Sequence, residues 1–134
     1  MLDASVALAW CFPDEVSAAA RMLLVSLQGA ALRVPALWAT EIANGILSGA
    51  RRRRLPAGVP EQFLAVLMQL PIEVVHEPFE EHVRQAVTLG REQNLTAYDA
   101  AYLALALRQQ AVLATFDKQL RRAAMRLDIG LLPA

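Results

Sequence analysis

The chain has 134 residues, of which 56% are hydrophobic, and this content supports one substantial core and argues against a disordered protein. Lys and Arg together number 13, as do Asp and Glu, so a generally basic nucleic-acid-binding surface is excluded and any contact with a polyanion has to be local. A single cysteine, Cys11, excludes an internal disulfide framework. No apolar run approaches the roughly 18 residues of a membrane span, and no signal-peptide pattern precedes the first acidic residue, so we expect a soluble cytoplasmic protein with no membrane contact.

The first half of the sequence predicts mostly helices. Pro13 and Pro71 each end a helical stretch, Gly29 occupies the position that favours a helix C-terminus, and apolar residues at spacings of four follow Trp38. In chain order these signals predict helices over residues 4–12 and 15–29, a strand over 31–35, and helices over 36–54 and 61–70.

The second half alternates strands with helices. It predicts strand 72–77, a helix carrying Phe79, Val83, Val87 and Gly90, a helix from Thr96 to about Gln110, strand 111–116, helix 117–127 and strand 129–132. Short apolar strands separated by helices are typical of a parallel sheet covered on both faces. We therefore expect one α/β domain over residues 1–134, a three-layer α/β/α sandwich with a central parallel sheet.

Four acidic residues occupy equivalent positions in this predicted sheet. Asp3 and Asp117 directly follow predicted strands, and Glu41 lies in the first turns of a helix that follows a third. Asp99 begins a helix that has to run back against the strand direction, which leaves its start at the same edge. Ligands of open parallel sheets bind beyond the carboxyl ends of the strands, so the four carboxylates can converge there.

Four converging carboxylates would repel one another and raise one another's pKa values unless a cation lies among them. Oxygen ligands without thiolates or imidazoles select Mg²⁺ or Mn²⁺, which activate water and neutralise phosphate charge. Each acid also has a local interpretation: a turn residue for Asp3, a helix-surface acid for Glu41, a cap with Thr96 for Asp99 and an N-cap for Asp117.

The segments around these acids resemble the four motif regions of PIN-domain ribonucleases, specifically VapC-type toxins of bacterial toxin–antitoxin pairs. The segments are "LDASVALAW", "EIANGIL", "LTAYDAAYLALAL" and "LATFDKQLRRAA", in the family's order. The resemblance implies a PIN-like α/β/α fold and a Mg²⁺- or Mn²⁺-dependent endoribonuclease, the toxin of a toxin–antitoxin pair, that cleaves RNA with a metal-activated water. It also implies a homodimer and a cognate antitoxin that covers the acidic groove.

The resemblance assigns roles to individual residues. Asp3, Glu41, Asp99 and Asp117 match the acidic residues that bind the metal and carry catalysis. Ser5, Asn44 and Thr115 match polar residues that support this site. One departure is that only Met1 and Leu2 precede Asp3, so either the first strand is abbreviated or the natural start lies upstream.

Three alternatives stay open at this stage. The run Arg51, Arg52, Arg53 and Arg54 is interpreted either as a solvated helix end or as a contact to RNA or antitoxin. A non-catalytic PIN-like module that only binds a partner would keep the fold without turnover. A phosphoacceptor regulatory α/β domain would also place aspartates around Mg²⁺, but it would require an adjacent acid pair that "LDAS" lacks.

Overall fold

The structure is a computed structural model that describes residues 1–14 and 16–134; Glu15, where the second predicted helix begins, lies outside the described residues. Strand β1 (Leu32–Pro35) pairs in parallel with β2 (Ile72–Val75), and β3 (Leu113–Ala114) pairs in parallel with β4 (Leu131–Leu132). The parallel α/β arrangement predicted from the sequence is confirmed.

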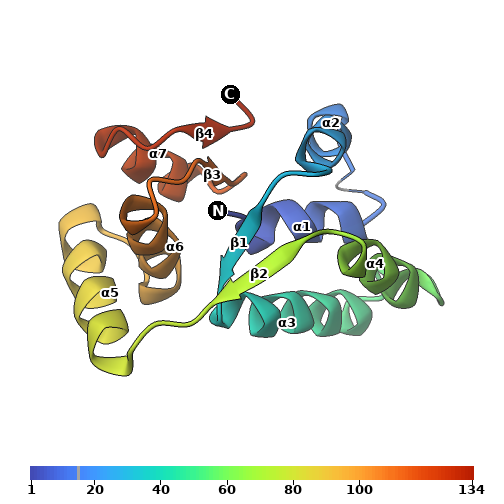
Figure 1. Ribbon diagram of the computed structural model, residues 1–134. Helices are drawn as coiled ribbons and strands as arrows, with labels where there is room; N and C mark the ends of the chain where they lie inside the picture. The colour runs from blue at the N-terminus through green and yellow to red at the C-terminus, as the bar shows by residue number, and fades with distance from the viewer. Residues whose placement is uncertain (15) are drawn as a thin grey trace.

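The first three residues join the two strand pairs. The amide of Leu2 donates to the carbonyl of Arg33 at 2.9 Å, and Leu2 forms a parallel bridge with Ala114. The amide of Asp3 donates to the carbonyl of Ala114 at 2.9 Å, and the N-terminus in Figure 1 lies between β1 and β3. The strand order is therefore β2, β1, Met1–Asp3, β3, β4, and the abbreviated first strand occupies the centre of the sheet.

Seven helices are formed by the described residues, and their positions follow the predicted order. Their bounds are α1 (Ala4–Cys11), α2 (Ala18–Leu27), α3 (Leu37–Arg51), α4 (Val59–Met68), α5 (Phe79–Gln93), α6 (Ala97–Arg108) and α7 (Lys118–Arg126). In Figure 1, α5 and α6 lie on one side of β1 and β2, while α1, α3 and α4 lie on the other. Helices thus flank the strands on both sides.

Helix α6 forms the centre of the core. Every residue from Ala100 to Ala106 is buried, because the helix packs against α5, α7, β1 and β3. A helix that is apolar on all sides is stable only in such an interior position. The start of α6 is nevertheless half-exposed at Asp99, so a rigid, buried element carries one of the four acids at its end.

Helix α3 ends three residues earlier than its sequence predicts. The amide of Arg54 donates to the carbonyl of Gly49 at 2.9 Å, and that of Arg53 donates to Ala50 at 3.0 Å. Arg53 has a φ of 53°, so the end is a Schellman motif with arginine in the left-handed position. None of the described helices is long and apolar enough to cross a lipid bilayer.

Candidate functional site

Asp3 is held at the centre of the sheet by two hydroxyl groups. Its Oδ2 accepts hydrogen bonds from Ser5 Oγ at 2.5 Å and from Thr115 Oγ1 at 2.6 Å. The two hydroxyl oxygens in turn accept from the amides of Phe116 at 3.1 Å and Asp117 at 3.0 Å. Because each hydroxyl has one proton and already accepts from an amide, both protons are directed at Asp3.

Glu41 lies on the second turn of α3 and contacts the core through α6. Its Oε2 accepts a hydrogen bond from the hydroxyl of Tyr102, a residue with no exposed surface. Burial and the carboxylate of Glu41 raise the pKa of Tyr102, so the hydroxyl keeps its proton and acts as a donor. The sequence pattern is compatible with Tyr102 as either a core or a dimer-interface aromatic; it is a core residue, and its contact with Glu41 was not predicted.

Asp99 and Asp117 both sit at helix starts. Thr96 Oγ1 accepts from the amide of Asp99 at 3.2 Å and donates to its Oδ2 at 3.1 Å. The Oδ1 atom of Asp117 accepts from the amide of Leu120 at 2.7 Å and caps α7. The local capping interpretations of these two acids are therefore confirmed, and the caps fix where each carboxylate lies.

Burial and neighbouring carboxylates raise the pKa values of three acids, Asp3, Glu41 and Asp99. Burial raises the pKa of Asp3 against the hydrogen bonds from Ser5 and Thr115, and the charge of Asp117 adds to the rise. Burial also raises the pKa values of Glu41 and Asp99. The charges of Asp3 and Asp99 add to the pKa rise of Glu41, and those of Asp117 and Asp3 add to that of Asp99.

The carboxylates share one negative region without forming a closed ligand set. Across residues 1–14 and 16–134, no three His, Cys, Asp or Glu side chains are arranged so that they could hold a metal ion. Within the same residues, Glu41, Asp99 and Asp117 each use one oxygen in a hydrogen bond, and their second oxygens accept none. The donor chemistry suits a hard divalent cation, which would relieve the mutual repulsion.

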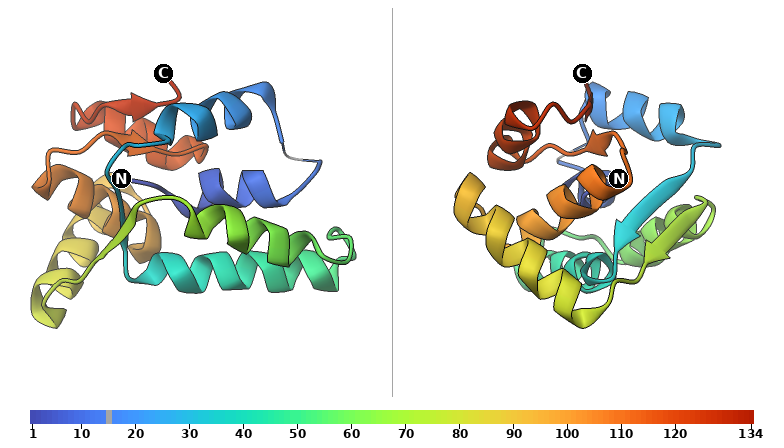
Figure 2. Two further views of the ribbon diagram at one scale, coloured as in Figure 1. Left: turned by 45° about the vertical axis from the view of Figure 1, so that its right-hand side comes forward. Right: turned by 60° about the vertical axis from the view of Figure 1, so that its left-hand side comes forward.

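A cleft of about 600 Å³ opens beside Asp117 and extends between α1 and α3. Its acidic end includes Ser5 and Asp117, and its other end includes Arg52 and Arg54. The rest of the lining is formed by Leu8, Ala9, Phe12, Ser17, Gly45, Ser48, Gly49 and Phe116. Helix α1 runs alongside α3 (Figure 2, left view). Gly45 and Gly49 leave room there for the side chains of Leu8 and Phe12.

The arginine run divides into different environments. Arg54 binds the carboxylate of Asp14 at 2.9 Å and lies over the Phe12 ring at 4.4 Å. Arg51, Arg52 and Arg53 are exposed, as a solvated helix end requires, but only Arg52 also lines the cleft.

The side chain of Asn44, one turn after Glu41, is exposed and makes no hydrogen bond within the described residues. Whether it supports the site, as the resemblance implies, stays a prediction.

Comparisons with known proteins agree on one family. Residues 1–125 match the family model described as PIN domain. The chain is 32% identical over 120 residues to Ribonuclease VapC3 of Pyrobaculum aerophilum, and the alignment covers 90% of each protein. The crystal structure of PAE2754 from Pyrobaculum aerophilum superposes with a TM-score of 0.67 at 27% identity, covering 91% of this chain and 76% of that one. The family resemblance of the four motif regions is confirmed.

Proposed function

Because the chain belongs to the PIN-domain family, we propose that it is a Mg²⁺- or Mn²⁺-dependent endoribonuclease that acts as the toxin of a toxin–antitoxin pair. One observation carries the proposal: Asp3, Glu41, Asp99 and Asp117 come from four separate parts of the chain and share one region of negative charge. The raised pKa values of three of them mean that the site is more stable when a cation offsets the charge. The 32% identity to a protein named a ribonuclease supports RNA as the substrate.

In the described part of the chain, no three of these acids already form a ligand set, so the four would have to adjust around the cation to hold it. The bound cation would supply a water-derived nucleophile and neutralise charge on the phosphate. The chain's own residues position these acids. Ser5 and Thr115 direct their protons at one oxygen of Asp3, so that carboxylate is fixed as an acceptor. Both hydroxyls also hold the loop before α7, which places Asp117 next to Asp3.

Tyr102 has a comparable role on the other side of the site. Its hydroxyl holds one oxygen of Glu41 and leaves the second oxygen for a ligand. Since Tyr102 lies one turn after Asp99 on the buried helix α6, the same helix positions two of the four acids. We infer that Tyr102 is a positioning residue of the nuclease site.

The direct test is RNA cleavage in the presence of Mg²⁺ or Mn²⁺ by the natural protein and by Asp99→Asn. The asparagine side chain still accepts from Thr96, so the cap survives while a charged oxygen is lost. We expect the cleavage rate to fall on the order of 100-fold or more, the scale of removing one electrostatic stabilising group. Equal cleavage by the two proteins would remove Asp99 from the proposed site.

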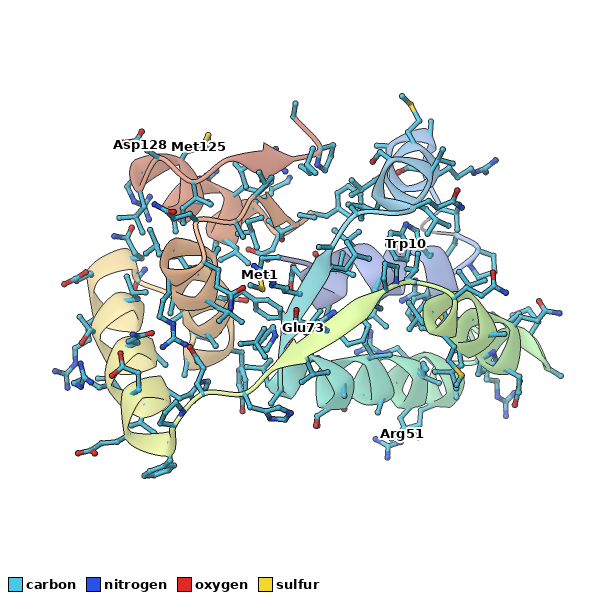
Figure 3. The ribbon with its side chains drawn as sticks, viewed as in Figure 1. Met1, Trp10, Arg51, Glu73, Met125 and Asp128 are labelled. Carbon is cyan, nitrogen blue, oxygen red and sulfur yellow. The ribbon has the colours of Figure 1, made fainter. Side chains whose placement is uncertain are left out.

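Asp128→Asn is the matched control, because it makes the same change at an exposed acid beyond the far end of α7 (Figure 3). This variant should cleave RNA as the natural protein does. Calorimetric titration with Mn²⁺ separates the remaining alternatives. An intact fold that binds no Mn²⁺ would favour the non-catalytic partner-binding module, and an aspartyl-phosphate formed from a small phosphodonor would favour the regulatory domain.

We also propose that the chain forms a homodimer, supported by an apolar stripe on α5. Phe79, Val83 and Val87 follow one another at spacings of four and are 83%, 43% and 44% exposed. Contiguous exposed apolar surface of this kind typically marks a contact with another protein. Val83→Glu should convert a dimer into a monomer in light scattering, whereas a monomeric natural protein would contradict the proposal.

The cognate antitoxin is proposed to cover the acidic site and hold the nuclease inactive. Its support is the family membership and the VapC relative, together with an acidic region that a basic protein segment could neutralise. Inspection of the neighbouring reading frame provides a test. A small adjacent gene for a DNA-binding protein that blocks cleavage when co-purified is the expected result.

A further inference from the structure

We propose that the cleft between α1 and α3 binds the RNA strand that flanks the cleaved phosphate, and that Arg52 binds a second phosphate of that strand. The inference rests on the proposed ribonuclease activity and adds a substrate-binding site to it. It selects one arginine from a run of four, on the basis of where the fold places each side chain.

Helix α3 presents a continuous stripe to this cleft. Gly45, Ser48, Gly49 and Arg52 line the cleft at spacings that keep them on one helix face, and Glu41 precedes them on the same face one turn before Gly45. At 1.5 Å per residue, Glu41 and Arg52 are about 16 Å apart along the helix, which is more than one nucleotide of an extended strand can cover. A phosphate at Arg52 is therefore separate from the phosphate at the acids.

Small residues in the middle of the stripe let α1 pack closely against this wall of the cleft. Gly45 and Gly49 carry no side chain, and a methyl group on either would overlap Leu8 or Phe12 of α1. Ser48 adds a short polar side chain to the same wall. Leu8 is only half-buried and offers a nucleobase an apolar contact, whereas Phe12 is buried behind Arg54. The hydroxyl of Ser48 can bond a base edge or a ribose.

Charge favours an RNA strand as the occupant. An acidic peptide would suit Arg52 and be repelled at the four acids, and a basic peptide would have the reverse preference. A polyanionic strand suits both ends, because the cation that the acids require also accommodates the phosphate there. With 13 basic and 13 acidic residues in the chain, binding depends on such local placement.

Arg52 differs from its neighbours in being available for this role. Arg54 is already held by Asp14 and lies over Phe12, so it forms the end wall of the cleft. Arg52 is exposed, lines the cleft and makes no side-chain hydrogen bond or ion pair within the part of the chain that the structure describes. Arg51 extends away from α3 on the side opposite α1 (Figure 3) and does not line the cleft.

The test compares Arg52→Gln with Arg51→Gln, which removes an equal charge from the adjacent residue. Steady-state cleavage is measured on an RNA long enough to span the cleft in both directions. We expect Arg52→Gln to raise KM about tenfold with kcat unchanged, the scale of losing one charged hydrogen bond. The slope of log affinity against log salt concentration should also become shallower by about 0.7 in Arg52→Gln, which corresponds to the loss of one phosphate contact with a single strand. Arg51→Gln should change neither KM nor this slope.

Shortened substrates locate the contact. When nucleotides are removed one at a time from either end, the difference between Arg52→Gln and the natural protein should vanish once the phosphate at Arg52 is lost. Trimming from the other end should leave the difference in place. Equal effects of the two arginine variants, or a difference that persists in every trimmed substrate, would overturn the inference and indicate diffuse electrostatic attraction.

A second variant tests occupation of the cleft without changing charge. Ser48→Leu narrows the cleft and should raise KM for the long RNA while leaving the salt slope unchanged, with the fold verified by its melting temperature. An unchanged KM would contradict the proposed path. If Arg52→Gln lost antitoxin binding but kept the KM of the natural protein, Arg52 would contact the protein partner and not RNA. If the natural protein cleaved no RNA, the proposed nuclease activity itself would be refuted.

Discussion

Thr115→Val removes a single buried hydroxyl from the candidate site while keeping the shape of the side chain. Thr115 has no exposed surface, and its hydroxyl donates to Asp3 at 2.6 Å and accepts from the amide of Asp117 at 3.0 Å. A hydrogen bond to a charged group contributes about 1.5–3 kcal/mol, and an amide left without an acceptor costs about 1–3 kcal/mol. We therefore expect Thr115→Val to lower the free energy of unfolding by about 3–5 kcal/mol.

The assay is urea unfolding of the metal-free protein followed by circular dichroism, with Thr115→Ser as the matched variant. Serine retains the hydroxyl and loses one methyl group, so its cost should be about 1 kcal/mol. If the valine and serine variants lose the same stability, packing of the methyl group rather than the hydroxyl network holds this site together, and the reasoning about Asp3 fails.

Three further outcomes follow from the site. Tyr102→Phe should keep the fold but shift the acidic limb of the cleavage pH profile to higher pH, because Glu41 loses the hydrogen-bond donor that favours its charged form. An unshifted profile would mean that Tyr102 does not position Glu41. Burial and neighbouring charges raise the pKa values of Asp99 and Glu41, so the folded protein binds more protons than the unfolded chain. Unfolding free energy of the metal-free protein should fall as pH rises from about 4 through these folded pKa values, and Asp99→Asn should flatten that dependence in melts across pH. Gly49→Ala would press a methyl group against the Phe12 ring and should lower the free energy of unfolding by about 1–3 kcal/mol in urea unfolding. An unchanged free energy of unfolding would contradict this close contact between α1 and α3.

Much of the fold could be predicted because the periodicity of apolar residues is local. Helices form where the sequence predicts them, within a few residues. The end of helix α3 and the extent of strand β3 could not be predicted from the apolar pattern. The left-handed arginine at position 53 ends α3 without the glycine that normally announces such a turn. The apolar residues predict strand 111–116, yet only Leu113–Ala114 pair as a strand, and the amides of Phe116 and Asp117 donate to the hydroxyls of Ser5 and Thr115 in place of a neighbouring strand.

The candidate site was predictable in its acids and less so in their supports. Strand-end positions predict that the four carboxylates converge, which their shared negative region supports, and the family resemblance implies the hydroxyl groups of Ser5 and Thr115. Tyr102 was not connected to the site, although its spacing of three residues from Asp99 places both on one face of α6. On α5, the regular apolar spacing correctly predicts a helix, but it does not reveal that the apolar residues of this stripe are exposed to solvent.

The central position of Met1–Asp3 has a consequence for synthesis of the chain. Leu2 pairs with Ala114, and Asp3 receives its hydroxyl partner from Thr115, so contacts across more than a hundred residues complete the sheet. Such distant contacts form late, because the intervening chain has to be made and folded first. The four-carboxylate cluster therefore cannot be completed until Thr115 and Asp117 have been synthesised, so under the proposed function an unfinished chain would lack the nuclease site.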